Sequence, residues 1–354
     1  MSNQTGSAPA GAPVAVEFDR VNIVFGDRPD LALPLMDRGL SRTDIQKETG
    51  QILGVHDCSL TVARGEILVL MGLSGSGKST LLRAVNGLNP VCRGSVTVHD
   101  GDWSCEVGSA SKEDLLKVRR SCVAMVFQQF GLLPWRTVRE NVGLGLELAG
   151  MTGEEMRTKV DAQLKLVGLS ERADAKVGEL SGGMQQRVGL ARAFVTDAPI
   201  LLMDEPFSAL DPLIRTRLQD ELLELQAKLH RTIIFVSHDL DEAFKIGNRI
   251  ALMEGGRIVQ CGTAREIIAN PVSDYVADFV NHMNPLSVLT ARDAVEPTPN
   301  AIPTTGATDI DTPIKEVMAR LKDETRALEV TDHGRVVGQV SRRTVIARLL
   351  DPRG

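Results

Sequence analysis

Apolar and polar positions divide the chain into short buried strands and amphipathic helices. Continuous apolar runs, typical of strands buried on both faces, occupy residues 67–71, 122–127, 199–203 and 232–236. Helical patterns fill much of the sequence between these runs, and one of them extends from an Asp-Pro start signal to Leu229. Strands that alternate with helices predict an α/β domain with a mainly parallel sheet.

Further strands are predicted outside this alternating core. The segment 14–25 begins with alternating apolar residues and is predicted to be an edge strand, and residues 250–260 are predicted to form a hairpin. Residues 100–111 are predicted to form a polar loop. The apolar spacing within 27–53 and the capping pattern Thr43-x-x-Gln46 predict a short helical insert. A surface excursion without chemistry is the simpler interpretation of this insert.

The composition along the chain predicts four parts. Residues 1–13 are rich in Ser, Gly, Ala and Pro and are expected to be a disordered tail. Residues 14–285 are expected to form the α/β domain, with a helical subdomain at about 130–180. Residues 286–312 contain several prolines and threonines and are predicted to be a linker. The last part, 313–354, has an αββα-like pattern and is expected to be too short to bury much core alone.

The overall composition limits the class of function. The chain has 354 residues, a net charge of −6 and 3% aromatic residues, whereas nucleic-acid surfaces need a basic face and stacking rings. The five cysteines lack Cys-x-x-Cys spacing and are expected to be reduced thiols in the cytosol. No apolar run approaches the ~20 residues of a membrane-spanning helix, and the N-terminus lacks a signal-peptide pattern. Any membrane role is therefore expected to depend on a partner.

One glycine-rich stretch carries the clearest chemistry. It follows the apolar run 67–71 and precedes a helical pattern, which is the context that a phosphate-binding P-loop requires. Glycines let the backbone approach phosphate closely, and the N–H groups of the loop then surround the anion. Lys78 is expected to reach the β- and γ-phosphates, and the Ser79 hydroxyl to bind Mg²⁺. The residues expected to contact nucleotide here are Gly72, Leu73, Ser74, Gly75, Ser76, Gly77, Lys78, Ser79 and Thr80.

Two acidic residues end a later strand. Asp204 and Glu205 follow the apolar run from Ile200, which places two carboxylates at the carboxyl edge of the sheet beside the P-loop. Asp204 is expected to hold Mg²⁺ through water, and Glu205 to orient and deprotonate the attacking water. Taken alone, the pair is also compatible with an acidic turn at the end of a strand.

A second phosphate-binding signal precedes these carboxylates. Ser181, Gly182 and Gly183 begin a helix, whose N-terminus attracts anions. One domain has no use for two anion sites on a single triphosphate, whereas two copies placed head to tail would use both. The sequence therefore predicts a homodimer in which each nucleotide lies between the P-loop of one copy and the Ser-Gly-Gly of the other.

With these motifs in this order, the α/β domain resembles the ATP-binding cassette (ABC) ATPases. The resemblance implies a P-loop NTPase fold, in which a RecA-like core carries an antiparallel β subdomain and an α-helical subdomain. It also implies that Gln128 senses Mg²⁺ and couples to the partner, and that Asp211 lies at the dimer interface. His238 would contact the γ-phosphate, and Phe25 would stack on adenine. Gln129 adjoins Gln128, so the choice between the two glutamines depends on the resemblance.

Within this family the chain is similar to the ATPase subunits of quaternary-amine importers. The similarity lies in the insert at 27–53, the P-loop at 71–80 and the segment 187–192. Choline importers are the closer branch, on the evidence of residues 130–136 and the acidic loop 100–106. The implied reaction is hydrolysis of ATP to ADP and phosphate, coupled to the import of choline or a related amine such as glycine betaine.

The resemblance also implies cofactors and partners. The cofactors would be ATP and Mg²⁺, and the partners a second copy of the chain, an integral membrane permease and, indirectly, a substrate-binding protein. The chain would then lie at the cytoplasmic face of the inner membrane as a peripheral subunit. Osmotically regulated relatives carry two CBS modules. Here residues 312–318 and 334–341 resemble at most one, so a small C-terminal α+β CBS-like unit is expected.

Two other functions remain open at this point. One is the ATPase subunit of a different ABC importer, for an amino acid or another small solute. The other is a soluble ABC protein without a transport role, a class that usually has two cassettes in one chain or a long coiled coil. This chain has one Ser-Gly-Gly-Met-Gln motif and no long heptad run, which favours the transport function.

Overall fold

The computed structural model of the protein describes residues 11–128, 131–281, 286, 288–296, 303–321 and 326–350. The chain divides into two compact units, one formed by 1–238 with 251–259 and the other by 239–250 with 260–354. Gln129, Phe130 and most of the predicted tail lie outside the described residues.

An antiparallel sheet occupies the N-terminal part of the first unit. Its strand order is β2-β1-β4-β5, and each neighbouring pair is antiparallel. The prediction of an edge strand was therefore wrong for β1, because an alternating pattern shows which face is buried but not which strands lie beside it. The predicted polar loop contains β5, in which only Cys105 is buried, so no periodic signal was available. The strands are β1 (Val14–Phe25), β2 (Ile52–Ala63), β4 (Arg93–Asp100) and β5 (Trp103–Glu106).

A second sheet has the order β10-β9-β3-β8-β7-β6. Strands β3, β8, β7 and β6 are parallel, and β3, β7 and β8 are buried at every position, as their continuous apolar runs predict. Because parallel strands end at one edge, the segments that follow β3, β7 and β8 meet there. The strands are β3 (Ile67–Met71), β6 (Val123–Val126), β7 (Ile200–Asp204), β8 (Thr232–Val236), β9 (Arg249–Glu254) and β10 (Arg257–Gly262).

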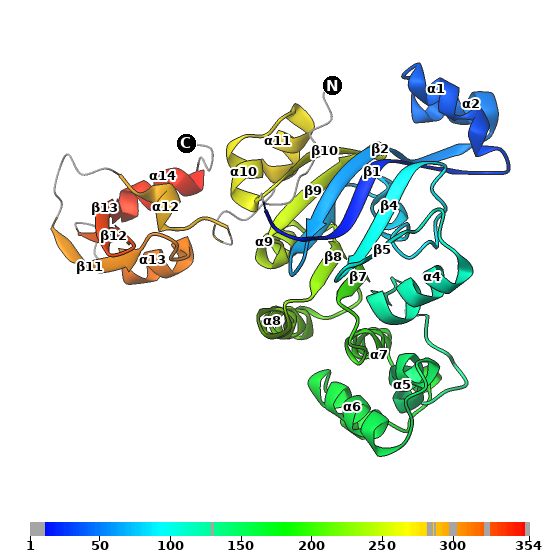
Figure 1. Cartoon of the computed structure of the whole chain (residues 1–354). Helices are drawn as coiled ribbons and strands as arrows, with labels where there is room; N and C mark the ends of the chain where they lie inside the picture. Colours follow the sequence, from blue (N-terminus) through cyan, green and yellow to red (C-terminus); the bar gives the residue numbers. More distant parts are fainter. Residues whose placement is uncertain are drawn as a thin grey trace. The chain divides into compact units, whose positions relative to one another are not determined.

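The helices of the first unit include a group of three. Helices α5, α6 and α7 contact one another, and in Figure 1 they lie together in green, apart from the antiparallel strands. Helix α8 begins as predicted, with Asp211 as its N-cap and Pro212 in its first turn. In the described parts of the chain, no helix combines the length and apolar character needed to cross a bilayer. The helices are α3 (Lys78–Leu82), α4 (Lys112–Lys117), η2 (Val118–Cys122), α5 (Val138–Leu148), α6 (Gly153–Leu166), η3 (Ser170–Arg172), η4 (Val177–Glu179), α7 (Gly182–Phe194) and α8 (Pro212–Leu229).

The insert between β1 and β2 folds as short helices with a core of their own. The Ser41 hydroxyl accepts a hydrogen bond from the Asp44 N–H and caps α2, so the predicted cap at Thr43 was wrong by two residues. The buried apolar side chains of the insert pack with two residues of the adjoining strands and form one cluster, made of Val24, Ala32, Leu35, Met36, Ile45 and Leu53. The helices are η1 (Pro29–Leu31), α1 (Leu33–Asp37) and α2 (Arg42–Thr49).

The second unit ends in a small α+β module. A three-stranded sheet has the order β11-β12-β13, in which β11 is parallel and β13 antiparallel to β12. The elements of this unit are α9 (Leu240–Ile246), α10 (Ala264–Ala269), α11 (Asp274–Asn281), α12 (Ala291–Ala294), β11 (Thr304–Asp309), α13 (Ile314–Arg320), β12 (Ala327–Asp332), β13 (Arg335–Ser341) and α14 (Arg342–Leu350).

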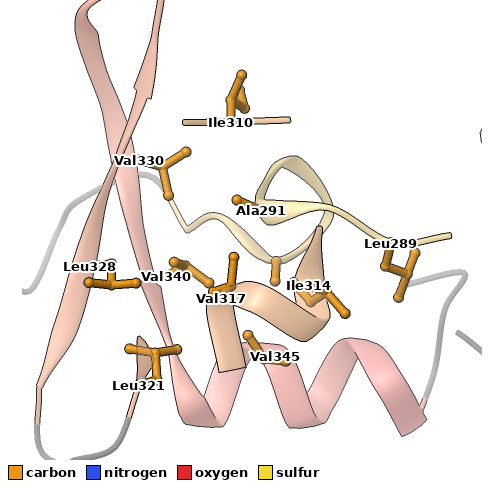
Figure 2. Close-up of a cluster of buried hydrophobic side chains, with 11 residues drawn as sticks. Leu289, Ala291, Ile310, Ile314, Val317, Leu321, Leu328, Val330, Val340 and Val345 are labelled. Atoms are coloured by element: carbon orange, nitrogen blue, oxygen red, sulfur yellow. The ribbon is translucent and has the colours of Figure 1, made fainter. Parts of the chain in front are cut away.

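This module buries a core that the sequence analysis did not anticipate. Figure 2 shows apolar side chains of the strands, α13 and α14 converging on one cluster, together with Leu289 and Ala291. Helix α12 and strand β11 fall inside 286–312, so the prediction of a plain linker was wrong for these residues. The prolines and threonines of this range obscured two short elements that complete the core of the module.

Candidate functional site

The P-loop joins β3 to α3 and depends on glycine at two positions. At Gly72 φ is +140°, and an added Cβ would lie 2.1 Å from the carbonyl oxygen of Met253. At Gly77, the N-cap of α3, φ is +101°, and a Cβ would lie 2.6 Å from the Gly54 carbonyl oxygen. Both glycines are therefore required by backbone conformation and by close neighbours. Their compact turn delivers Lys78 to the first position of the helix.

The tip of this loop is open. Leu73, Ser74 and Gly75 are exposed, and a Cβ at Gly75 would meet no atom within 4 Å. The Ser76 hydroxyl is buried and has no hydrogen-bond partner in the described part of the chain. Thr80, one turn into α3, is partly buried. An open tip and an unpartnered hydroxyl are compatible with a loop that binds a phosphate ligand.

The ammonium group of Lys78 lies within the loop. Its Nζ donates to the carbonyl oxygens of Gly72 at 2.8 Å and Leu73 at 3.1 Å, and the side chain is buried. Burial lowers the pKa of Lys78, while the carboxylates of Glu205 and Asp204 act in the opposite direction. A desolvated cation beside an open anion site can neutralise phosphate charge.

Ser79 and Asp204 are the two side chains whose oxygen atoms the sequence predicts as ligands of Mg²⁺, and they lie next to each other. The Ser79 hydroxyl donates to Asp204 Oδ1 at 2.6 Å, and Arg83 donates to Oδ2 at 2.8 Å. Asp204 is fully buried. The described residues contain no group of three or more acidic, His or Cys side chains that could hold a metal. A hydroxyl and one carboxylate nevertheless fit Mg²⁺ well, because this ion usually takes its other ligands from phosphate and water.

Glu205 lies next to Asp204 and brings two more predicted residues together. Gln128 donates from Nε2 to Glu205 Oε2 at 3.0 Å, and His238 Nδ1 lies 3.5 Å from the same oxygen. The three side chains come from the ends of β6, β7 and β8, at the shared carboxyl edge of the sheet. The arrangement provides a carboxylate that can accept a proton, with a polar side chain on either side. Gln129, the alternative to Gln128, lies outside the described residues.

The backbone of Glu205 has an unusual conformation. Its φ of +50° lies in the left-handed region that non-glycine residues rarely adopt. Four hydrogen bonds hold it there. The Glu205 N–H donates to the Val236 carbonyl at 3.2 Å, and the Glu205 carbonyl accepts from Gln186 Nε2 at 3.2 Å and from Ser208 Oγ at 3.1 Å and N–H at 3.3 Å. Strain that is held in place in this way is concentrated at functional sites, which supports a role for this carboxylate.

The second predicted anion site faces open space. Ser181 caps α7 through its hydroxyl, which accepts from the Met184 N–H, and a Cβ at Gly182 would meet no atom within 4 Å. Gly183 lies against the carbonyl of Ala209, and Asp211 is exposed at the start of α8. The described part of a single chain does not bring these residues into contact with its own P-loop.

Phe25 lies close to the P-loop, as its predicted role requires. Its ring packs so closely on Gly54 that a Cβ there would lie 2.8 Å from the ring, and Gly54 in turn contacts Gly77. The side chain is 38% exposed, which leaves ring surface accessible. The insert does not displace Phe25 from the loop, because β1 and β2 pair up to Phe25 and Ile52.

Three polar residues of this region were not assigned roles from the sequence. Arg83 follows Ser79 by four positions, on the same face of the helix, and this spacing could have identified it. Gln186 lies in the Ser-Gly-Gly segment, but its contact with the Glu205 backbone depends on the fold. Arg42 belongs to the insert and donates to the Gly75 carbonyl of the P-loop at 3.0 Å. No sequence signal indicated that contact.

Comparison with known proteins agrees with this geometry. Residues 55–208 match the ABC transporter family model. The chain is 50% identical over 289 residues to the glycine betaine/proline betaine transport system ATP-binding protein ProV of Escherichia coli, covering 82% of this chain and 71% of ProV. It is 42% identical over 347 residues to the trimethylamine N-oxide transport system ATP-binding protein TmoW of Ruegeria pomeroyi, covering 96% of this chain and 98% of TmoW.

Solved structures lead to the same conclusion. The dimeric structure of MJ0796, a bacterial ABC transporter cassette, aligns with a TM-score of 0.60 and 30% identity over 70% of this chain and 98% of that cassette. A post-hydrolysis dimer of MJ0796 bound to ADP and Pi aligns equally well. The P-loop, the Asp-Glu pair and the Ser-Gly-Gly helix therefore occur in the fold to which the sequence assigned them. The chain belongs to the ATP-binding subunits of ABC transporters, in the group whose relatives serve importers of glycine betaine and similar quaternary amines.

Proposed function

We propose that this chain hydrolyses ATP to drive the import of a small solute with a trimethylated nitrogen, and that glycine betaine is the first candidate. The similarity to ProV over most of both chains carries this proposal. Choline, which the sequence resemblance favours, has the same cationic head group and stays within the proposed class.

Trimethylamine N-oxide is a second candidate because of one specific observation. The match to TmoW extends over almost the whole of both chains, whereas the match to ProV leaves more than a quarter of ProV uncovered. This chain and TmoW have similar lengths, so the aligned region includes the C-terminal module of this chain. Both solutes present a trimethylated nitrogen, so one transport experiment can distinguish them.

The proposed chemistry uses the residues at the carboxyl edge of the second sheet. Lys78 and the loop N–H groups would bind the phosphates of ATP. The Ser79 hydroxyl would bind Mg²⁺, and Asp204 would hold the ion through water. The ion, when bound, neutralises charge on the phosphates. Glu205 would accept a proton from the attacking water. Gln128 and His238 would fix the orientation of the Glu205 carboxylate. The distances of 3.0 Å and 3.5 Å around Glu205 Oε2 support these roles.

The proposed active form is a head-to-tail dimer of two copies. Ser181, Gly182 and Asp211 are exposed and do not contact the P-loop of their own chain within the described residues. In the dimer they would face the nucleotide held by the partner, which explains why one chain has two anion sites. The dimeric MJ0796 cassette, aligned over 98% of its length, supports this assembly.

A groove beside Gln128 is the proposed docking site for the permease. It has a volume of about 360 Å³ and lies between β6 and the helices α5 and α7. Its walls combine apolar and basic side chains, among them Phe127, Leu144, Leu148, Arg120 and Arg192. Trp135, four residues after the lining residue Gly131, is 68% exposed. An exposed aromatic side chain is typical of a partner surface. Docked there, the chain would work at the cytoplasmic face of the membrane.

Transport by the complete complex tests the proposed function. The chain is co-expressed with the permease and binding protein of its own importer, in cells that lack other importers of these solutes. Uptake of radiolabelled glycine betaine, choline, trimethylamine N-oxide and histidine is then compared between the native chain and Lys78→Ala. Uptake of one trimethylated solute that depends on Lys78 supports the proposal. Uptake of histidine alone, or of none of the four, contradicts it.

A further inference from the structure

Arg42 connects the insert to the centre of the P-loop. It is the first residue of α2, and its guanidinium reaches three backbone carbonyls. Nη1 donates to Gly75 at 3.0 Å, Nε donates to Leu53 at 2.8 Å, and Nη2 donates to Leu53 and, at 3.5 Å, to Gly54. One side chain thus joins the insert, the start of β2 and the phosphate-binding loop.

The charge of Arg42 is not balanced by the protein that surrounds it. Every acceptor of its hydrogen bonds is a neutral carbonyl, and in the described part of the chain no carboxylate pairs with it. These bonds use four of its five N–H groups and leave one on Nη1. The residue is partly buried, so its charge is only partly solvated. A cation placed in this way attracts an anion, and the P-loop is the anion-binding element next to it.

The position of Arg42 is well defined. Helix α2 is anchored by Ile45, which is fully buried in the cluster that the insert forms with β1 and β2. Ser41 caps the start of the helix, and Gly50 ends it in the left-handed conformation. At the other end of the contact, Gly75 has no atom near its Cβ position, so the Arg42 bond supports an otherwise open loop tip.

We propose that Arg42 is a positioning residue of the nucleotide site: it holds the P-loop tip against the insert and adds a second positive charge, besides Lys78, for the phosphates of ATP. The insert is then part of the nucleotide site, not a surface excursion without chemistry. This inference depends on the proposed P-loop site, because it assigns Arg42 to the same phosphates.

The number of phosphates on the ligand provides the test. Displacement of a fluorescent ATP analogue from the full-length chain by ATP, ADP and AMP is measured for the native chain, Arg42→Met and Arg42→Lys. Because Coulomb energy scales with ligand charge, Arg42→Met should weaken the binding of ATP by about tenfold, of ADP by about sixfold and of AMP by about threefold. Arg42→Lys keeps the positive charge but lacks the planar set of N–H donors of the guanidinium group. It should therefore bind ATP more tightly than Arg42→Met and less tightly than the native chain. The loss in Arg42→Met should shrink at high salt.

Two control variants separate the possible outcomes. Lys47→Met removes an exposed cation from the same helix and should leave all three affinities unchanged. Lys78→Ala must abolish ATP binding, and if it does not, the P-loop site itself is wrong. If Lys78→Ala loses binding while Arg42→Met does not, only the Arg42 inference fails. An equal loss for ATP, ADP and AMP would also overturn it, because that result indicates a structural tether without an electrostatic contribution.

Discussion

The buried side chain of His56 pairs with the exposed Arg257, and this pair should make the ATP-binding unit sensitive to acid. His56 lies on β2 and is 7% exposed, and its Nε2 is 2.8 Å from Nη2 of Arg257. Arginine can only donate hydrogen bonds, so Nε2 must accept and the ring must be neutral, with its proton on Nδ1. Burial, followed by the charge of Arg257, lowers the pKa of His56 from 6.5 to about 4.

The stability effect follows from this pKa. The unfolded chain binds the proton first, so the stabilisation is complete above pH 6.5 and is lost as the pH falls from 6.5 towards 4. The pKa of His56 differs by about 2.5 units between the unfolded and folded states, which corresponds to about 3 kcal/mol of unfolding free energy. About 2 kcal/mol of this should be lost between pH 7 and pH 5. The backbone next to this pair also contacts the P-loop. The backbone N–H of His56 donates to the Gly256 carbonyl, and the backbone N–H of Gly256 donates to the Ser76 carbonyl.

The assay compares the native chain with His56→Gln, which keeps an acceptor for Arg257 but cannot be protonated. Urea unfolding of the ATP-binding unit at pH 7, 6 and 5 should show a steeper loss of stability for the native chain, by about 2 kcal/mol at pH 5. NMR signals of the His56 ring should keep their neutral positions down to about pH 5. Parallel stability curves, or a His56 titration near pH 6.5, would refute the reasoning.

Three further predictions concern other surfaces of the chain. Trp135→Asp should reduce co-purification with the permease at least tenfold without changing ATP affinity, because it places a charge on the proposed docking surface; normal co-purification, or an equal loss for the exposed control Leu116→Asp, would contradict this. Residues 313–354 hold nine Lys/Arg and six Asp/Glu, a net charge of +3, so this segment is expected to bind an anionic membrane in a salt-dependent way. Removing residues 313–354 should therefore abolish the salt dependence of transport in anionic vesicles; unchanged salt dependence would exclude this electrostatic role. Burial raises the pKa of the Cys58 thiol to about 12, so native protein at pH 8 should not be alkylated there within hours, while urea-unfolded protein should react within minutes; equal rates in the two states would contradict the burial.

The sequence was informative where local patterns determine structure. The runs that became β3, β7 and β8 are buried at every position, so their apolar character alone identified them. Helix α8 starts at its Asp-Pro signal, because capping involves only neighbouring residues. The carboxyl-edge rule for parallel strands placed the P-loop and Glu205 together from the sequence alone.

The features that escaped prediction depend on contacts between distant residues. His56 and Arg257 are separated by 201 positions, and no periodicity links them. Arg42 is one of several basic residues in the insert, and only the fold shows that it reaches Gly75. Strand β11 was missed because it pairs with β12 in a small sheet whose core comes from several short elements.

Substitution of Glu205 by glutamine tests the central claim most directly. Glutamine keeps the size and the hydrogen bonds of the site but cannot accept a proton from water, so phosphate release should fall by roughly 10²–10⁴-fold. The substitution leaves the proposed phosphate contacts of Lys78 and Ser181–Gly183 in place, so saturating Mg-ATP should trap a dimer.

The measurement combines size-exclusion chromatography in Mg-ATP and in Mg-ADP with an assay of phosphate release. The account predicts a Glu205→Gln protein that elutes as a dimer with ATP, as a monomer with ADP, and hydrolyses ATP very slowly. Near-normal hydrolysis would show that Glu205 is not the base. A variant that stays monomeric in saturating ATP, while the native chain supports transport, would contradict the head-to-tail dimer.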